Sequence, residues 1–146
     1  MPSNPSVAPI TSLVEQLKRD EGTRLHLYVD SVGKTTIGTG RNLSDVGISQ
    51  DEADLMLAND ITHATAQLEI SFPWMASLDD VRRAVLQNMA FNMGVHGLAG
   101  FKDFLNKMQA GDFRAAAGAM LDSKWAEQVG PRAQRLSVQL ETGEWQ

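Results

Sequence analysis

The sequence contains no cysteine, and this absence excludes several kinds of chemistry at once. Without thiols there is no disulfide framework, no cysteine nucleophile, no cysteine-ligated zinc site and no iron–sulfur cluster. Long apolar runs are absent as well, because charges interrupt every hydrophobic stretch before the roughly 18 residues that a membrane-spanning helix needs. The opening MPSNPSVAPITSL has neither the basic start nor the apolar segment of a signal peptide. We therefore expect a soluble chain, made in the cytoplasm, without a membrane segment.

Positive charge is scarce in one half of the chain. Residues 1–80 hold 5 Lys and Arg against 12 Asp and Glu, a net charge of −7, whereas residues 81–146 hold 8 against 6, a net charge of +2. Proteins that bind nucleic acid usually present a basic face, so this balance argues against a nucleic-acid partner. An anionic ligand is expected to contact the C-terminal half.

Signals for metals and cofactors are missing too. The three histidines, His26, His63 and His96, show no metal-ligand spacing and no nearby acid partner. Gly38 and Gly40 form a lone G-x-G without a following helix, which a tight pair of strands explains better than a phosphate loop. We expect no metal and no cofactor, and we interpret the seven methionines, which fall mostly at helical spacing, as packing residues.

The chain does contain enough apolar material for a folded domain, since 42% of its 146 residues are hydrophobic. Proline and serine are concentrated at the N-terminus, which predicts a flexible lead-in over residues 1–11. The patterns that follow predict a small N-terminal lobe over 12–48, a connecting helix over 49–72 and a helical C-terminal lobe over 73–146. We interpret these parts as one single domain and expect the site in a cleft between the lobes.

The N-terminal lobe has the pattern of one helix followed by a β-hairpin. An S-x-x-E capping-box pattern at residues 12–15 and a glycine at position 22 predict a helix from about 12 to 21. From residue 24 to 30, apolar and polar residues alternate as in a strand. The turn signal SVGK then leads to TTIGTG, which predicts a second strand.

The rest of the chain has the pattern of helices. A second S-x-x-E pattern at residues 49–52 begins a long helix that Phe72-Pro73 ends. Ser77 is predicted to begin another, whose apolar stripe is closed by Gly94. Shorter helical runs are predicted near residues 101–109, 112–121, 123–128 and 132–140. The predicted fold class is therefore α+β, mainly α, with a small antiparallel sheet and a helical body.

Two carboxylates stand at the two ends of the first predicted strand. Glu21 lies in the last turn of its helix, where the negative end of the helix dipole and the adjacent Asp20 favour the protonated form. Asp30 ends the strand before a turn, where water favours ionisation. Cleavage of a glycosidic bond needs one carboxyl group to protonate the leaving oxygen and one to support attack from the other side. The same residues also fit a solvated helix end and an aspartate that bonds the amides of its own turn.

The longer pattern around these acids resembles a known signature. Residues Asp20 to Gly40 follow D-E-G-x-R-L-x-x-Y-x-D-x-x-G-x-x-T-I-G-x-G, which is similar to the T-even phage lysozymes, the family 24 glycoside hydrolases. The resemblance implies that Glu21 is the general acid and Asp30 the second catalytic carboxylate. It also implies that Thr36 helps to hold the attacking water.

The resemblance covers nearly everything after residue 12. Residues 48–60 are similar to the start of the family's inter-lobe helix, and residues 78–101 to the core helix of its C-terminal lobe. Residues 121–145 are similar to the family's closing helices. It implies a lysozyme-like fold and a cofactor-free N-acetylmuramidase that cleaves, with inversion, the β-1,4 bond between N-acetylmuramic acid and N-acetylglucosamine in bacterial peptidoglycan. It further implies a monomeric endolysin of the host cytoplasm that reaches the periplasmic wall once a holin has permeabilised the membrane, and so causes host cell lysis.

Three further positions carry expectations. Arg41 stands where the family commonly has a histidine, and an arginine can take over an ion-pairing role but not a pH-sensitive one. Phe91 aligns with an aromatic residue near the saccharide, although its methionine-rich apolar stripe favours a core position. Arg132 matches the arginine that faces the catalytic glutamate, and it also fits an ordinary solvated helix arginine. Phe91 and Arg132 are therefore candidate substrate-binding residues.

Two alternatives stand beside the free enzyme. One is a cell-wall-binding or virion structural module with the lysozyme fold but little turnover. The intact set of Glu21, Asp30 and Thr36 favours the enzyme over this module. The other alternative keeps the active site but makes the chain the lytic domain of a phage tail or a bacteriocin, for which the proline-rich lead-in would suit a fusion joint.

Overall fold

The structure is a computed structural model that describes residues 9–146. The lead-in predicted over residues 1–11 therefore lies mostly outside the described residues. The chain divides into two compact units, Met1–Ala53 and Asp54–Gln146.

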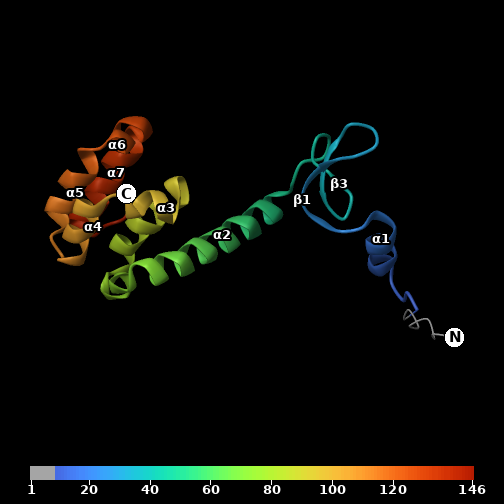
Figure 1. Cartoon of the computed structure of the whole chain (residues 1–146), viewed down its shortest axis with the longest axis horizontal. Coiled ribbons are helices and arrows are strands. Elements are labelled where there is room, and N and C mark those ends of the chain that lie inside the picture. Colours follow the sequence, from blue (N-terminus) through green and yellow to red (C-terminus); the bar gives the residue numbers. More distant parts are fainter. Residues whose placement is uncertain (1–8) are drawn as a thin grey trace. The chain divides into compact units, whose positions relative to one another are not determined.

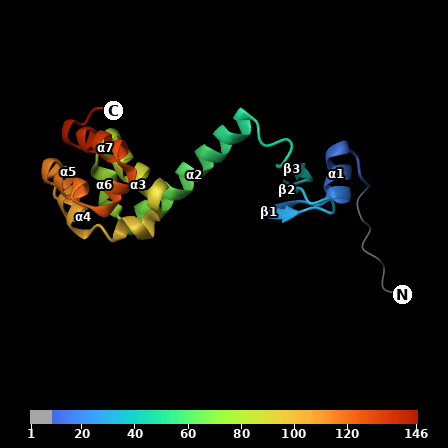
Figure 2. The same cartoon turned by 90° about the horizontal axis from the view of Figure 1, so that it is seen from above.

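The first unit contains one helix and a small sheet (Figure 1). Its elements are α1 (Leu13–Glu21), β1 (Arg24–Val29), β2 (Thr35–Gly38) and β3 (Arg41–Asn42). The strands form one antiparallel sheet in the order β1-β2-β3, seen beside α1 in Figure 2. Thr36 of the central strand pairs with Tyr28 on one side and with Asn42 on the other. The first two strands confirm the predicted hairpin, whereas the sequence did not predict the two-residue β3.

Local hydrogen bonds explain where α1 begins and ends. Ser12 Oγ accepts the N–H of Glu15 at 3.2 Å, which confirms the predicted N-cap. The Glu15 carboxylate extends beyond Ser12 and accepts the N–H of Thr11 at 2.8 Å. At the other end, the N–H of Gly22 donates to the carbonyl of Lys18 and closes the last turn. The helix therefore ends with Glu21 as its last residue.

The second unit is helical and is coloured from green to red in Figure 1. It holds most of α2 (Gln50–Ser71), whose residues 50–53 belong to the first unit. The remaining elements are η1 (Pro73–Ser77), α3 (Asp80–Ala99), α4 (Lys102–Gln109), α5 (Phe113–Leu121), α6 (Lys124–Val129) and α7 (Pro131–Thr142). The four short helices predicted after residue 100 are confirmed, and so is the fold class, α+β and mainly α.

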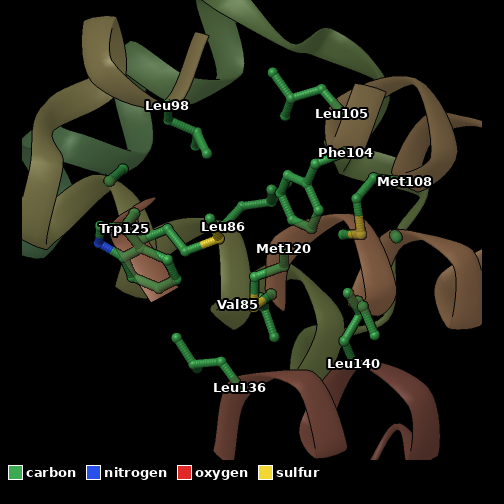
Figure 3. Close-up of a cluster of buried hydrophobic side chains, with 14 of the residues drawn as sticks. Val85, Leu86, Leu98, Phe104, Leu105, Met108, Met120, Trp125, Leu136 and Leu140 are labelled. Atoms are coloured by element: carbon green, nitrogen blue, oxygen red, sulfur yellow. The ribbon is translucent and has the colours of Figure 1, made fainter. Parts of the chain in front are cut away.

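A hydrophobic core holds the second unit together (Figure 3). Among the described residues, every buried hydrophobic side chain lies between Leu68 and Leu140. The larger ones are Leu68, Met75, Val85, Leu86, Met89, Leu98, Phe104, Leu105, Met108, Met120, Trp125, Leu136 and Leu140. Four of the chain's methionines belong to this set, which confirms their interpretation as packing residues.

Arg82 ties α3 to the helices that follow it. Its guanidinium group lies over the ring of Phe113 in α5, 4.1 Å from the ring centroid. Its Nε donates to the carbonyl of Leu140 at 2.8 Å, and its Nη2 donates to the carbonyl of Glu141 at 3.0 Å. One side chain therefore joins the start of α3 to α5 and to the end of α7.

Two predicted helix boundaries need correction. Ser77 does not cap α3, because its hydroxyl donates to the carbonyl of Trp74 within the short 3-10 helix η1. Asp79 is the N-cap instead, and its carboxylate accepts the N–H of Arg82 at 2.9 Å. Gly94 interrupts the helix with a φ of 78°, as a terminal glycine would, but helical turns resume and continue to Ala99.

The aromatic residues are unevenly divided between the units. The three tryptophans, Trp74, Trp125 and Trp145, all belong to the second unit. Trp125 is buried and donates its indole N–H to Oδ1 of Asn92 at 2.8 Å. The one tyrosine of the sequence, Tyr28, lies on β1 of the first unit.

Over residues 9–146, no helix combines the length and the apolar character that crossing a bilayer requires. The same part of the chain holds no group of three histidine or acidic side chains arranged to bind a metal ion.

Candidate active site

Glu21 lies where the end of α1 meets the end of the sheet. The hydroxyl groups of Thr23 and Thr39 share a hydrogen bond of 2.9 Å, and Arg24 pairs with Gly38 in the ladder. The chain after this ladder passes directly beside Glu21. A methyl group in place of the Gly40 α-hydrogen would lie 3.1 Å from Oε2 of Glu21 and 3.3 Å from its carboxyl carbon.

Asp20, the acidic neighbour of Glu21, carries its own counter-ion. Nε of Arg19 donates to Oδ1 of Asp20 at 2.7 Å, and both side chains are exposed. This hydrogen bond lowers the pKa of the Asp20 carboxyl group below its ordinary value. The like charge that the sequence places beside Glu21 is thus accompanied by a positive one.

Asp30 forms the turn that follows β1. Its Oδ1 accepts two backbone hydrogen bonds, from the N–H of Val32 at 3.0 Å and from the N–H of Lys34 at 2.8 Å. This arrangement confirms the interpretation of Asp30 as an aspartate that bonds the amides of its own turn. Among the residues that the structure describes, nothing donates a hydrogen bond to the second oxygen, Oδ2. One carboxylate oxygen is therefore fixed and the other is available.

Thr36 lies in the central strand and is only 3% exposed. Its Oγ1 donates to the carbonyl of Lys34 at 3.0 Å. The hydroxyl proton is thereby used within the protein, so the oxygen is left to accept a hydrogen bond. The backbone of Lys34 joins the two side chains, because its N–H binds Asp30 and its carbonyl binds Thr36.

Arg41 pairs with Glu52 at the start of α2. Its Nη1 donates to Oε2 at 2.7 Å and its Nη2 donates to Oε1 at 2.5 Å, while Nη1 also binds the carbonyl of Gly47 at 3.2 Å. The hydrogen bonds from Arg41, with a further one from the N–H of Ser49, lower the pKa of Glu52 from 4.5 to about 2. The predicted ion-pairing role of Arg41 is confirmed, and its partner is Glu52.

The two candidate substrate-binding residues line one groove of about 390 Å³ in the second unit. Phe91 is 50% exposed at this groove, so the prediction that it belongs to the core is wrong. Arg132 binds α3 through Asn88, since its Nε donates to Oδ1 at 2.8 Å and its Nη2 donates to the carbonyl oxygen at 3.2 Å. The exposed ring of Trp145 lines the same groove. Aromatic rings beside amide and guanidinium groups are suited to binding polar, ring-shaped ligands.

Two residues of the site were not found by sequence reasoning. The sequence identified Gly40 only as part of a strand pair. The glycine in its G-x-G motif could have indicated that another side chain, here that of Glu21, lies against the backbone at this position. Glu52 was identified only as the end of a capping box, which it also forms with Ser49 at 3.2 Å and 2.8 Å.

Comparisons with known proteins identify the family of this chain. Residues 18–139 match the family described as Phage lysozyme. The pre-baseplate central spike protein Gp5 of Enterobacteria phage T4 is 32% identical over 92% of this chain, which spans only 28% of that protein. Probable T4-type lysozyme 1 of Dictyostelium discoideum is 27% identical, with 92% of this chain and 96% of that protein covered. An endolysin of Acyrthosiphon pisum secondary endosymbiont phage 1 is 31% identical, with 76% and 75% covered.

Proposed function

Because this chain belongs to the phage lysozyme family, we propose that it hydrolyses the β-1,4 bond between N-acetylmuramic acid and N-acetylglucosamine in bacterial peptidoglycan. Family membership gives lysozyme-type hydrolysis of the cell wall, with peptidoglycan as the substrate.

Glu21 is the general acid of the proposed reaction. It protonates the glycosidic oxygen as the bond breaks, while a water molecule attacks the anomeric carbon from the opposite face, which inverts its configuration. The carboxyl group rests against the bare backbone of Gly40, which leaves no side chain of that residue between it and the solvent. The site needs no metal ion and no cofactor for these steps.

Asp30 and Thr36 position and activate the water. The observation that carries this assignment is the Lys34 backbone, which binds Oδ1 of Asp30 through its N–H and Oγ1 of Thr36 through its carbonyl. Both groups are thereby held with one acceptor oxygen unused, Oδ2 of Asp30 and Oγ1 of Thr36. Two fixed acceptors can orient the two hydrogens of one water molecule, and the aspartate can take a proton from it.

Phe91 and Arg132 are proposed to contact the glycan. An aromatic ring that is half exposed can stack on the apolar face of a sugar, and a guanidinium group can donate hydrogen bonds to acetamido or carboxylate oxygens. The groove that these residues share is lined on its apolar side by α2 residues such as Leu57 and Ile61.

The proposed setting is host cell lysis by a monomeric endolysin that acts after a holin has opened the inner membrane. A second setting, the lytic domain of a virion, has its own support in the 32% identity to the spike protein over 92% of this chain. Expression in the bacterial cytoplasm with and without a holin tests whether lysis depends on the holin. Lysis by the protein alone would contradict the dependence on a holin, and detection of the protein in washed virions would favour the second setting.

The test of the catalytic proposal is Glu21→Gln, measured by the clearing of Gram-negative cells with a permeabilised outer membrane. The amide cannot deliver the proton, so clearing should fall by at least about 100-fold. Glu69→Gln, which changes an exposed glutamate of α2, is the matched control and should clear like the unchanged protein. Equal clearing by Glu21→Gln, or none by the unchanged protein, would contradict the proposal. Product mass and anomeric configuration then identify the bond and the stereochemistry.

A further inference from the structure

We propose that Arg41 is a positioning residue for Glu21. By holding Glu52 with two hydrogen bonds, it fixes the start of β3 and thereby the adjacent Gly40, against which the Glu21 carboxyl group lies. The inference rests on the proposed role of Glu21 as the general acid.

The Glu21 side chain is in contact with Gly40. Three atoms of the Glu21 side chain, Oε2, Cδ and Cγ, lie within 3.1–3.4 Å of the place where a side chain at position 40 would begin. Gly40 also has a φ of 70°, a conformation that residues with a side chain rarely adopt. The position of the carboxyl group therefore depends on where the backbone at Gly40 lies.

The sheet alone holds Gly40 through a short ladder. Gly40 lies in the tight connection between β2 and β3, and β3 has only two residues, Arg41 and Asn42. Their pairing with β2 consists of Ile37 opposite Arg41 and Thr36 opposite Asn42. One more hydrogen bond, from the N–H of Leu43 to the carbonyl of Thr35 at 2.8 Å, extends this pairing, and the ladder that holds Gly40 remains short.

The side chain of Arg41 adds a second attachment to this short ladder. Its two terminal nitrogens bind the two carboxylate oxygens of Glu52, and one of them also binds the carbonyl of Gly47. Glu52 is itself held, because its Oε2 accepts the N–H of Ser49 at 2.8 Å. A planar guanidinium bound at two points resists rotation as well as translation, which a single charge does not.

A role in global stability alone is the competing explanation, and the exposure of the pair argues against it. The side chains of Arg41 and Glu52 are 39% and 40% exposed, so water and salt weaken their attraction. Position matters more for a general acid than for a stabilising contact, because a displacement of about 1 Å can reduce turnover by about 100-fold. We therefore expect the pair to affect the rate more than the folding.

The experiment compares Arg41→Met, Glu52→Gln and the double variant, with the rate measured as reducing ends released from purified sacculi. Arg41→Met should lower kcat by about 10- to 100-fold with KM within about twofold. If the two residues act as one unit, the double variant should be no worse than the poorer single variant. Arg41→Lys, which keeps the charge but not the two-point contact, should recover only part of the rate.

Arg83→Gln is the matched control. Arg83 of α3 also pairs with a carboxylate, that of Asp80, at 2.9 Å and binds the carbonyl of Leu78 at 2.7 Å, but it lies in the second unit. Its loss should lower the melting temperature and leave kcat unchanged. If Arg41→Met lowers the melting temperature as much as Arg83→Gln does and also lowers kcat, the reduced kcat is due to lost positioning and not to lost stability.

Arg41→His adds a readout that a purely structural role would not give. An imidazole can form an ion pair with Glu52 only while it is protonated, so the kcat of Arg41→His should fall as the pH rises through neutrality, relative to the unchanged protein.

If Arg41→Met keeps kcat within about twofold while Glu21→Gln is inactive, the positioning role is wrong and the proposed function stands. If Glu21→Gln stays active, the proposed function fails and this inference with it. If Arg41→Met does not fold, Glu52→Gln replaces it, because it breaks the same ion pair. A kcat of Glu52→Gln within about twofold of the unchanged protein then contradicts the positioning role.

Discussion

Asp30 and Lys34 hold each other through two hydrogen bonds across the turn. The N–H of Asp30 donates to the carbonyl of Lys34 at 2.9 Å, and the N–H of Lys34 donates to Oδ1 of Asp30 at 2.8 Å. The carboxylate is therefore part of the backbone turn, and its place does not depend on its charge. This separates what the group contributes to folding from what it contributes to chemistry.

Replacing Asp30 with Asn should remove activity without disturbing the fold. The amide oxygen of Asn can accept the N–H groups of Val32 and Lys34 just as Oδ1 does, so the free energy of unfolding should change by no more than about 0.5 kcal/mol. The amide cannot accept a proton from water, so hydrolysis should fall by at least about 100-fold. Chemical denaturation and release of reducing ends from sacculi measure the two effects. Full activity in Asp30→Asn would exclude Asp30 from the water-activating role.

Replacing Thr36 with Val should reduce both activity and stability. The new side chain has nearly the same shape, but the Lys34 carbonyl loses the hydrogen bond from Oγ1 and keeps only the one from the N–H of Asp30, which should cost about 0.5–1.5 kcal/mol. The water loses one of its two acceptors, so kcat should fall by about 10-fold or more. Thr36→Ser restores the hydroxyl and is the control, and it should recover most of the rate. A Val variant as active as the Ser variant would contradict the role of the hydroxyl.

Replacing Gly40 with Ala should affect Glu21 specifically. The new methyl group would lie 3.1 Å from Oε2 and displace the carboxyl group, in addition to a strain of about 1–2 kcal/mol from the positive φ. Gly111→Ala is the matched control, because Gly111 has a similar φ of 77° and no atom within 4 Å of the new methyl group. Both variants should lose similar stability, and only Gly40→Ala should lose turnover. Equal turnover in the two would show that the contact with Glu21 has no consequence.

Acid should weaken the protein partly through Glu52. Its pKa is lowered in the folded protein from 4.5 to about 2, chiefly by the hydrogen bonds from Arg41. A lowered pKa means that this contribution to stability is complete above pH 4.5 and disappears as the pH falls towards 2. The difference in melting temperature between the unchanged protein and Glu52→Gln should therefore shrink across this window. A difference that stays constant with pH would show that the ion pair is not its source.

Replacing Leu86 with Ala should destabilise the core of the second unit. Leu86 is fully buried, so the change leaves a cavity and should cost about 2–5 kcal/mol. Val138→Ala, at a 45% exposed position of α7, is the control and should cost much less. Urea unfolding measures both. Equal losses would mean that the packing around Leu86 collapses to fill the space.

The sequence predicted the elements whose ends depend on neighbouring residues. Ser12 caps α1 and Ser49 caps α2 through groups only three positions away, so the pattern contains the whole interaction. Ser77 offers the same kind of pattern, and there the prediction is wrong because the η1 turn that begins at Pro73 takes up its hydroxyl. A local pattern cannot show which of two nearby turns a side chain will join.

The same limit holds for the site, where the sequence predicts contacts between residues close in the chain but not contacts between distant ones. The turn around Asp30 follows from the residue itself and was anticipated, since both of its hydrogen-bond donors lie within four positions. The approach of Gly40 to Glu21 and the pairing of Arg41 with Glu52 depend on the register of the sheet. The apolar stripe of Phe91 continues on both sides and favours a core position, whereas a groove interrupts the packing at that point.

The division of the aromatic residues gives the protein two separate optical probes. All three tryptophans belong to the second unit, whereas Tyr28 lies in the sheet of the first, where the Arg24 guanidinium stacks on its ring at 4.5 Å. Tryptophan fluorescence therefore follows the unfolding of the helical body alone, and the tyrosine component of the second-derivative absorbance spectrum follows the strands next to Asp30 and Thr36. These two signals therefore report, without an added label, whether the first unit, which contains Asp30 and Thr36, unfolds before the second on heating or in denaturant.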